Sequence, residues 1–277
     1  MTLPVTCSFL TFNCFGGFHW NTPVRLRTLA SMLATMEPDV VCLQEVQSYL
    51  ALRLLLRTCT SHPHRTYARM AHAPAGALLT LARQPLTEPQ FIRYSSQGAW
   101  ISPTLMDRIT QKGALISSFT LGTYPVSVIN THLIANYWGN WTQNNPAALQ
   151  QQLQLHELAK LVQSQPSNRL LLVMGDFNIP RGCWLYEEFL QLSGLQDPLA
   201  GDQRPTYRPL PGVPMRYALP IDFVFLRVPP ELDVTATIDR CFVERVPLVS
   251  GGQGYLSDHL GLHVTLRWNT PLDSSAT

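Results

Sequence analysis

The stretch Leu170-Leu171-Leu172-Val173-Met174-Gly175-Asp176-Phe177-Asn178 decides the fold. Its apolar run is typical of a strand buried on both faces, and the strand ends at a glycine followed by a carboxylate and a carboxamide. Side chains two residues apart in an extended chain point the same way. We therefore expect Asp176 and Asn178 to present oxygen atoms together, while Phe177 turns into the core. This arrangement suits a divalent cation or an attacking water, although an ordinary polar turn uses the same residue types.

Length and composition indicate one large domain. The 277 residues contain no linker, repeat or low-complexity tract that would divide them, so residues 1–277 are predicted to form a single catalytic domain. The formal net charge of +2 is too small to indicate a dedicated nucleic-acid binder, because such proteins usually have an evident excess of lysine and arginine. We expect a monomer.

The cysteines and the amino-terminal segment bear on the cellular compartment. No two cysteines have the close spacing of a metal knuckle or a redox motif, and several lie in apolar runs, so we expect reduced, buried thiols. These are Cys7, Cys14, Cys42, Cys59, Cys183 and Cys241. The first residues lack the basic segment and cleavage site of a secretory signal, and no apolar stretch reaches the length of about 18 residues that indicates a membrane span. We expect a cytoplasmic protein that can also sit peripherally at membranes.

Strands and helices alternate along the chain in a pattern that predicts the architecture. Strands are expected at 6–12, 40–43, 77–81, 91–94, 113–119, 124–131, 170–174, 221–226 and 263–268. Helices are expected at 22–33, 49–57, 147–163 and 185–192. Because runs of consecutive strands interrupt the alternation, we predict an α/β fold: a four-layer α/β/β/α sandwich of two packed mixed β-sheets with helices on the outer faces.

Oxygen and imidazole groups gather at the predicted strand ends, where no serine or cysteine is paired with a base. Carboxylates and carboxamides suit Mg²⁺ or Mn²⁺ rather than a closed zinc site. The set therefore predicts metal-assisted attack of water on a phosphate ester. It comprises Asn13, Glu45, His132, Asp176, Asn178, Asp222, Asp258 and His259. Three other histidines, His62, His64 and His72, are expected at the surface.

Six short motifs resemble, in the same order along the chain, those of the endonuclease/exonuclease/phosphatase superfamily of Mg²⁺-dependent phosphoesterases, which has a deoxyribonuclease-like fold. They are Phe12-Asn13, Leu43-Gln44-Glu45, Asn130-Thr131-His132-Leu133, Gly175-Asp176-Phe177-Asn178, Ile221-Asp222-Phe223 and Ser257-Asp258-His259. Within the superfamily the chain is most similar to the neutral sphingomyelinase branch. That likeness rests on Phe12-Asn13-Cys14-Phe15-Gly16, Lys112-Gly113-Ala114-Leu115 and Thr131-His132-Leu133-Ile134-Ala135-Asn136-Tyr137.

The resemblance implies how one group of these residues would handle the metal and the phosphate. Glu45 would hold the metal ion, with Asn13 and Asp258 beside it. Asp176 and Asn178 would orient the attacking water and a phosphoryl oxygen, either directly or with a second metal ion.

The resemblance also implies the proton-transfer groups. His259, aligned by Asp222, would be the general base, and His132 would donate to the phosphoryl oxygen as negative charge builds on it. The alternative is that Asp222 merely ends a strand and His259 packs in the core. Pro220 stands where the superfamily often has an arginine, so any contact of that arginine would be absent or supplied elsewhere.

Two aromatic segments follow the first and third motifs and bear on the substrate. They contain Phe15, Phe18, His19 and Trp20, and Tyr137, Trp138 and Trp141. Amphipathic rings settle at membrane interfaces, but they also stack on nucleic-acid bases or simply pack a loop. With the resemblance, they favour a sphingomyelinase-like phospholipid phosphodiesterase with phospholipase C-type cleavage, reaching membranes through surface loops. The alternatives are a nuclease of the abasic-site endonuclease or deoxyribonuclease type, an inositol-phosphate phosphatase, and an inactive binding scaffold.

Overall fold

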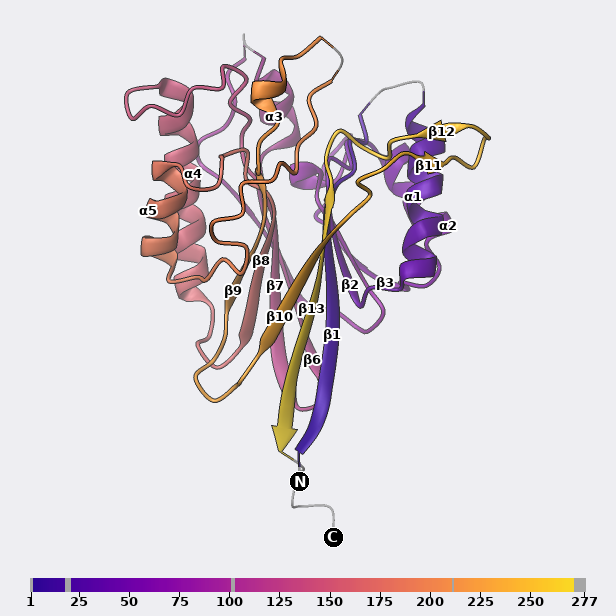
Figure 1. Ribbon diagram of the computed structural model, residues 1–277, viewed down its shortest axis with the longest axis vertical. Helices are drawn as coiled ribbons and strands as arrows, with labels where there is room; N and C mark the ends of the chain where they lie inside the picture. Colours follow the sequence, from indigo (N-terminus) through magenta and orange to yellow (C-terminus); the bar gives the residue numbers. More distant parts are fainter. Residues whose placement is uncertain (1, 18–20, 101–102, 211, 272–277) are drawn as a thin grey trace.

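Two β-sheets lie face to face between two pairs of helices (Figure 1). The computed structural model describes residues 2–17, 21–100, 103–210 and 212–271. Both sheets contain parallel and antiparallel strand pairs, and the helices cover their outer faces. The four-layer α/β/β/α sandwich predicted from the sequence is therefore confirmed.

The first sheet brings the carboxyl ends of two strands together at one edge. Its strand order is β10 (Thr235–Cys241), β13 (Gly261–Pro271), β1 (Thr2–Asn13), β2 (Val40–Gln44), β4 (Leu79–Ala82) and β3 (His64–Thr66). Strands β1 and β2 run parallel, with Asn13 paired to Gln44 at their ends. Asn13 and Glu45, which directly follows β2, are therefore neighbours.

The second sheet delivers three of the predicted site residues to adjacent positions. Its strand order is β5 (Thr87–Arg93), β6 (Gly113–Leu121), β7 (Tyr124–His132), β8 (Leu170–Asp176) and β9 (Asp222–Arg227). Parallel pairing of β7 with β8 sets His132 against Asp176, and antiparallel pairing of β8 with β9 sets Asp176 against Asp222. The end of β7, the end of β8 and the start of β9 therefore meet at one edge.

The long helices form the outer layers, as Figure 1 shows. Helices α1 (Thr22–Met36) and α2 (Tyr49–Thr58) cover the first sheet, and α4 (Pro146–Ser164) and α5 (Trp184–Ser193) cover the second. Helix α4 begins where the Asn145 side chain accepts hydrogen bonds from the N–H groups of Ala147 and Ala148. The loops carry the short helix α3 (Leu105–Thr110), the 3₁₀ turns η1 (Ala75–Ala77) and η2 (Met215–Tyr217), and the hairpin of β11 (Val246–Pro247) and β12 (Gln253–Gly254). No helix in the described part of the chain has the length and apolarity needed to cross a bilayer.

Strand β8 shows how the alternation of side chains builds the layers. Leu170, Leu172 and Met174 belong to the core between the two sheets. Leu171 and Val173 point the other way, into the core beneath α4 and α5. Each side chain is fully buried, so the apolar run fills two cores at once, as predicted for a strand covered on both faces.

Two expectations about individual residues have different outcomes. All six cysteines are unpaired in the structure; Cys7, Cys14, Cys42 and Cys59 are buried as expected, whereas Cys183 and Cys241 are only half-buried. The prediction that His62 lies at the surface is wrong, because its side chain is buried and hydrogen-bonded to the Pro38 carbonyl oxygen. His72 is exposed and His64 is half-buried. A polar residue type alone did not indicate that the loop after α2 folds over His62.

Candidate active site

A cavity of about 430 Å³ opens where the strand ends meet. Six of the eight predicted site residues line it, and the other two contact lining residues. Its lining includes Glu45, His132, Asp176, Asn178, Asp258 and His259, together with Asp107, Phe15, Tyr137, Trp141, Tyr207, Tyr217 and several aliphatic side chains. Asp222 lies behind His259, and Asn13, the eighth residue, joins Glu45 to Asp176 from below. The fold therefore brings the whole predicted set together.

Strand β8 ends in a backbone conformation that glycine adopts far more readily than other residues. Gly175 has φ = 151°, and a Cβ atom there would lie 1.9 Å from the Thr131 carbonyl oxygen of β7. The following turn buries Phe177 completely and leaves Asp176 at the cavity. Asn178 has φ = 54°, which asparagine tolerates better than most residues, and its N–H donates to Asp176 Oδ1 over 2.9 Å. Asp176 and Asn178 both line the cavity, but Asn178 lies in a turn rather than in the extended chain that the sequence argument assumed, and its Nδ2 donates to the Leu133 carbonyl oxygen.

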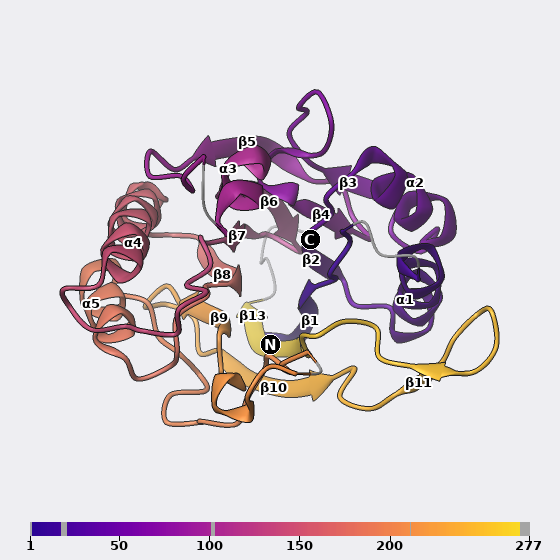
Figure 2. The ribbon, with the colours of Figure 1, turned by 90° about the horizontal axis from the view of Figure 1, so that it is seen from above.

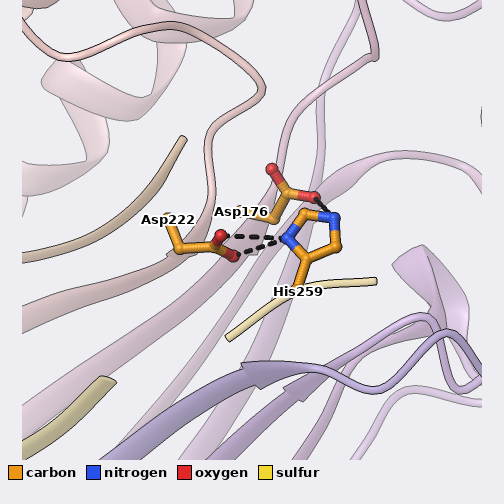
Figure 3. Close-up of side chains that lie close together, drawn as sticks. All are labelled: Asp176, Asp222 and His259. Carbon is orange, nitrogen blue, oxygen red and sulfur yellow. Dashed lines mark hydrogen bonds and ion pairs between the residues drawn. The ribbon is translucent and has the colours of Figure 1, made fainter. Parts of the chain in front are cut away.

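His259 lies between two carboxylates, as Figure 3 shows. Its Nδ1 is 2.9 Å from Asp222 Oδ2, and its Nε2 is 3.7 Å from Asp176 Oδ2. Burial alone would lower the pKa of His259, but the Asp222 and Asp176 carboxylates raise this pKa well above its usual value. The imidazole is thus oriented by one carboxylate and turned towards the other, rather than packed as an isolated core side chain.

The proline-rich segment before β9 supports this histidine. The Thr206 hydroxyl oxygen accepts hydrogen bonds from the backbone N–H groups of Ile221 and Asp222, both over 3.0 Å. The ring of Tyr207 lies against His259, with 5.2 Å between ring centroids. Sequence reasoning did not identify Tyr207, because nothing in its neighbourhood indicates which way an irregular segment folds back.

At the other end of the cavity, Asn13 holds two carboxylates in place. Its amide nitrogen donates to Glu45 Oε1 over 3.1 Å and to Asp176 Oδ2 over 2.9 Å, while its amide oxygen accepts from the N–H of Phe15. Burial raises the pKa of the Asp258 carboxyl, and the nearby negative charge of Glu45 raises it further. Two carboxylates that repel each other across a cavity form the kind of site that a cation stabilises.

The charge of the cavity wall also favours a cation. The described lining residues include the carboxylates of Glu45, Asp107, Asp176 and Asp258 but no lysine or arginine. Such a wall repels a phosphate ester unless a metal ion reverses its sign, and oxygen donors of this kind suit Mg²⁺ or Mn²⁺. Donor atoms of Asp176, Asp222 and His259 also lie within 4.8 Å of one another. Asp222 and His259 are already hydrogen-bonded to each other, so we expect Glu45 and Asp258 to be the metal ligands.

A buried lysine stands behind His132, and sequence reasoning had noted it only as part of a motif. Lys112 Nζ lies 3.0 Å from Asp107 Oδ1 and 2.8 Å from His132 Nε2. His132 Nε2 is also 3.3 Å from Asp176 Oδ2, and its Nδ1 is buried without a hydrogen-bond partner among the described residues. Lys112 therefore supplies the positive charge closest to His132, from a position just outside the cavity lining.

Two amide side chains join the sheets directly beneath the site. Gln44 Nε2 donates to Asn130 Oδ1 over 2.8 Å. Asn130 Nδ2 in turn donates to the carbonyl oxygens of Leu43 and Leu79. Gln44 directly precedes Glu45, and Asn130 lies two residues before His132 on β7. The bridge therefore connects the strand carrying the first carboxylate to the strand carrying the histidine.

The two aromatic segments differ in how much of them the structure places at the surface. Phe18, His19 and Trp20 lie outside the described residues. Tyr137 and Trp138 are 54% and 55% exposed. Trp141 is half-buried; its Nε1 donates to Gln151, and its carbonyl oxygen accepts from Trp184 Nε1. Trp141 is thus held by hydrogen bonds within the protein, whereas Trp138 is available for contact.

Comparison with known proteins identifies the family to which the sequence is similar. A model of the Endonuclease/Exonuclease/phosphatase family matches residues 10–259. No curated protein matches the sequence.

Solved structures share the fold over nearly the whole chain. Sphingomyelinase C from Streptomyces griseocarneus is 18% identical, with a TM-score of 0.70 over 94% of this chain and 99% of that chain. TDP2 from D. rerio, complexed with a single-strand DNA product, is 20% identical, with a TM-score of 0.72 over 94% and 98% of the two chains. A mutant of beta toxin from Staphylococcus aureus with bound magnesium ions is 16% identical, with a TM-score of 0.71 over 94% and 99%. At these identities the likeness establishes the fold.

Proposed function

The chain belongs to the Endonuclease/Exonuclease/phosphatase family of metal-dependent phosphoric ester hydrolases, and from this premise we propose that it is a Mg²⁺-dependent phospholipid phosphodiesterase. The observation that carries the proposal is His259, held by Asp222 on one nitrogen and turned towards Asp176 and the cavity on the other. The proposed reaction is phospholipase C-type cleavage, in which water attacks phosphorus and the lipid alcohol leaves.

The Asp222 carboxylate would fix the productive tautomer of His259. When His259 Nδ1–H donates to Asp222, Nε2 is left as an acceptor for a proton of the attacking water. The positive charge that then forms on the ring is stabilised by Asp222 and Asp176. His132, which lies beside the same Asp176 oxygen, would donate to a phosphoryl oxygen, and the Lys112 ammonium next to its ring would add positive charge there.

Glu45 and Asp258 would hold the metal ion, with Asn13 fixing Glu45 beside Asp176. The ion, Mg²⁺ with Mn²⁺ as the alternative, would supply positive charge to the phosphoryl oxygens. Asn178, whose N–H donates to Asp176, would help to orient the attacking water and the phosphate. The magnesium ions in the beta toxin structure support this choice of metal.

The walls of the cavity support a lipid substrate with one phosphodiester. Side chains of Leu210, Val213, Tyr217 and Leu219 line the cavity beside its polar floor. The described lining residues include no lysine or arginine, so the cavity lacks the cationic side chains that bind the phosphates of an inositol polyphosphate. The motifs shared with neutral sphingomyelinases, together with the similar fold of sphingomyelinase C, favour a sphingomyelin-like substrate.

A nucleic-acid phosphodiester is the second candidate, and one observation favours it. The fold is as similar to TDP2 bound to a single-strand DNA product as it is to sphingomyelinase C. The same catalytic groups would serve either substrate, since both present a phosphodiester to the same water.

A panel assay separates the two candidates. The wild-type protein and its H259A variant are incubated with Mg²⁺ and one of four substrates: sphingomyelin vesicles, phosphatidylcholine vesicles, plasmid DNA or an oligonucleotide with an abasic site. We expect the wild type to release the phosphorylated headgroup from a vesicle lipid and the variant to release far less. Cleavage of only the nucleic acids would replace the lipid proposal with the second candidate, and wild-type activity in the variant would reveal a contaminant.

A further inference from the structure

We infer that three segments around the cavity mouth form a docking surface for an anionic phospholipid bilayer. This inference rests on the proposed function and names the surface to which the enzyme would bind. The segments are residues 96–100 with 103–106, residues 135–145, and residues 205–210 with 212–219, and we call them the rim. The inference starts from the side chains that the rim exposes.

The described part of the rim exposes large apolar side chains from all three segments. Met215 is 72% exposed and Trp100 67%. Met106, Tyr137, Trp138, Leu210 and Val213 are each between 41% and 55% exposed. These seven form half of the fourteen large hydrophobic side chains that are exposed in the described structure. Apolar side chains gathered around an active-site mouth indicate an interaction surface rather than scattered surface residues.

The segments lie at the end of the molecule that holds the site. In Figure 1, α3 and the orange loop carrying η2 project at the end opposite the chain termini. Figure 2, which looks down on this end, places α3 and η2 on opposite sides of the strand ends. Two segments also meet directly, because a Cβ on Gly139 would lie 2.3 Å from the Tyr217 ring. Residues of two segments, 135–145 and 205–219, line the cavity itself, and the third segment ends beside Asp107, which also lines it. The rim therefore borders the opening that a lipid headgroup would enter.

The charge of the rim complements an anionic surface. Its three segments contain no aspartate or glutamate, whereas the carboxylates of the cavity, including Asp107 directly after the first segment, line the opening itself. Arg216 is exposed between Met215 and Tyr217, and Arg208 stacks on Tyr255 at 3.8 Å from the ring centroid. Apolar and aromatic side chains interleaved with arginine are typical of surfaces that settle among anionic headgroups.

The segment 205–219 is suited to act as the principal anchor. Its described residues include prolines at positions 205, 209 and 214, which restrict the backbone and reduce the conformational entropy that docking would cost. Its inner residues Thr206 and Tyr207 contact Asp222 and His259, while Met215 points to solvent. Docking through Met215 would therefore place the bilayer beside the catalytic histidine.

The test uses two exposed residues that do not line the cavity, Trp138 and Met215. A W138S/M215S variant is compared with a control variant, L153S/L192S, which removes exposed leucines from α4 and α5. Binding to phosphatidylcholine vesicles containing phosphatidylserine is measured by co-sedimentation in the H259A background, so that the vesicles are not consumed. We expect the rim variant to bind about tenfold more weakly or worse, and the control variant to bind like its parent. R216Q should weaken binding about fivefold, and only when phosphatidylserine is present.

Turnover separates this inference from the proposed function. With catalytic His259 restored, W138S/M215S should hydrolyse a short-chain, fully dissolved phospholipid like wild type and vesicle lipid more slowly. Failure of the wild type to cleave either lipid would overturn the proposed function, whereas the binding experiment would still decide the docking surface. The docking inference fails if the parent protein does not co-sediment with the vesicles, or if the rim and control variants bind them equally. It also fails if the protein binds a single-stranded oligonucleotide through the rim more tightly than it binds vesicles.

Discussion

His259 Nδ1 lies 2.9 Å from Asp222 Oδ2, although the two residues come from a loop and a strand 37 positions apart. If this pair supplies the general base, H259A removes the proton acceptor. Losses of about 10² to 10⁴ in turnover are usual for such a group. Steady-state kinetics on a soluble phosphodiester would measure the loss, with H156A on α4 as a control histidine. Turnover of H259A within tenfold of wild type would remove His259 from the mechanism.

D222N tests the orienting role separately from the base itself. An amide in place of the carboxylate can donate to His259 Nδ1 and favour the wrong tautomer, as the same substitution does in serine proteases. We expect D222N to lower turnover strongly with little change in the Michaelis constant, because the cavity wall remains intact. Circular dichroism and thermal unfolding of the variant would show whether the fold is retained. Wild-type turnover in D222N would mean that Asp222 only ends strand β9 and does not orient His259 for catalysis.

Glu45 provides a test of the metal site. E45Q keeps the shape of the side chain but removes one of the two repelling carboxylates, so Mg²⁺ affinity should fall. Isothermal titration calorimetry would measure that affinity directly, and a chelator should abolish activity in the wild type. E187Q removes an exposed charge from α5 and is the matched control. Unchanged Mg²⁺ affinity in E45Q would make the proposed ligand assignment wrong.

The amide bridge between Gln44 and Asn130 should contribute to stability. N130A removes a donor to two buried carbonyl oxygens, those of Leu43 and Leu79. Leaving a buried polar group unsatisfied costs about 1–3 kcal/mol, so the free energy of unfolding should fall by at least that amount. Urea denaturation would measure the change, with N144A at an exposed position as the control. Equal stability of the two variants would show that the bridge is replaced by other contacts.

The sequence predicted best those features that depend on local pattern. The apolar run of β8 and its Gly-Asp-Phe-Asn ending predicted a doubly buried strand with a polar end, and the pairing of β7, β8 and β9 explains why His132, Asp176 and Asp222 meet. The strand β10 (Thr235–Cys241) was not predicted: its side chains alternate between exposed and half-buried, but only Ala236 and Ile238 supply apolar contacts with the core between the sheets, which is too short a pattern to indicate a strand.

The contacts that depend on the course of loops could not be read from the sequence. Tyr207 reaches His259 only because the proline-rich segment folds back over β9, and Asp107 reaches Lys112 from a six-residue helix. The buried position of Lys112 also follows from tertiary packing, since a lysine at a strand start is ordinarily exposed. These residues completed the candidate site only when the arrangement in space was known.

His62 gives a prediction about stability and pH. Its Nε2–H donates to the Pro38 carbonyl oxygen over 2.6 Å, and its Nδ1 lies 2.9 Å from the Ser61 hydroxyl, which can donate to it. Both bonds use the neutral ring. Burial lowers the pKa of His62, so the unfolded chain takes up the proton at a higher pH than the folded chain. The contribution of the neutral ring is therefore fully present above the unfolded pKa of about 6.5 and is lost as pH falls below it.

Urea unfolding between about pH 8 and about pH 5 would measure this dependence. At about pH 8 we expect H62A to have a lower free energy of unfolding than wild type. Between about pH 8 and about pH 5 this free energy should fall less in H62A than in wild type, because H62A has no buried imidazole to protonate. H72A, at an exposed position, should keep the slope of the wild type. Parallel curves for wild type and H62A would show that the folded protein protonates His62 as readily as the unfolded chain does, and that Nδ1 is not bound as an acceptor.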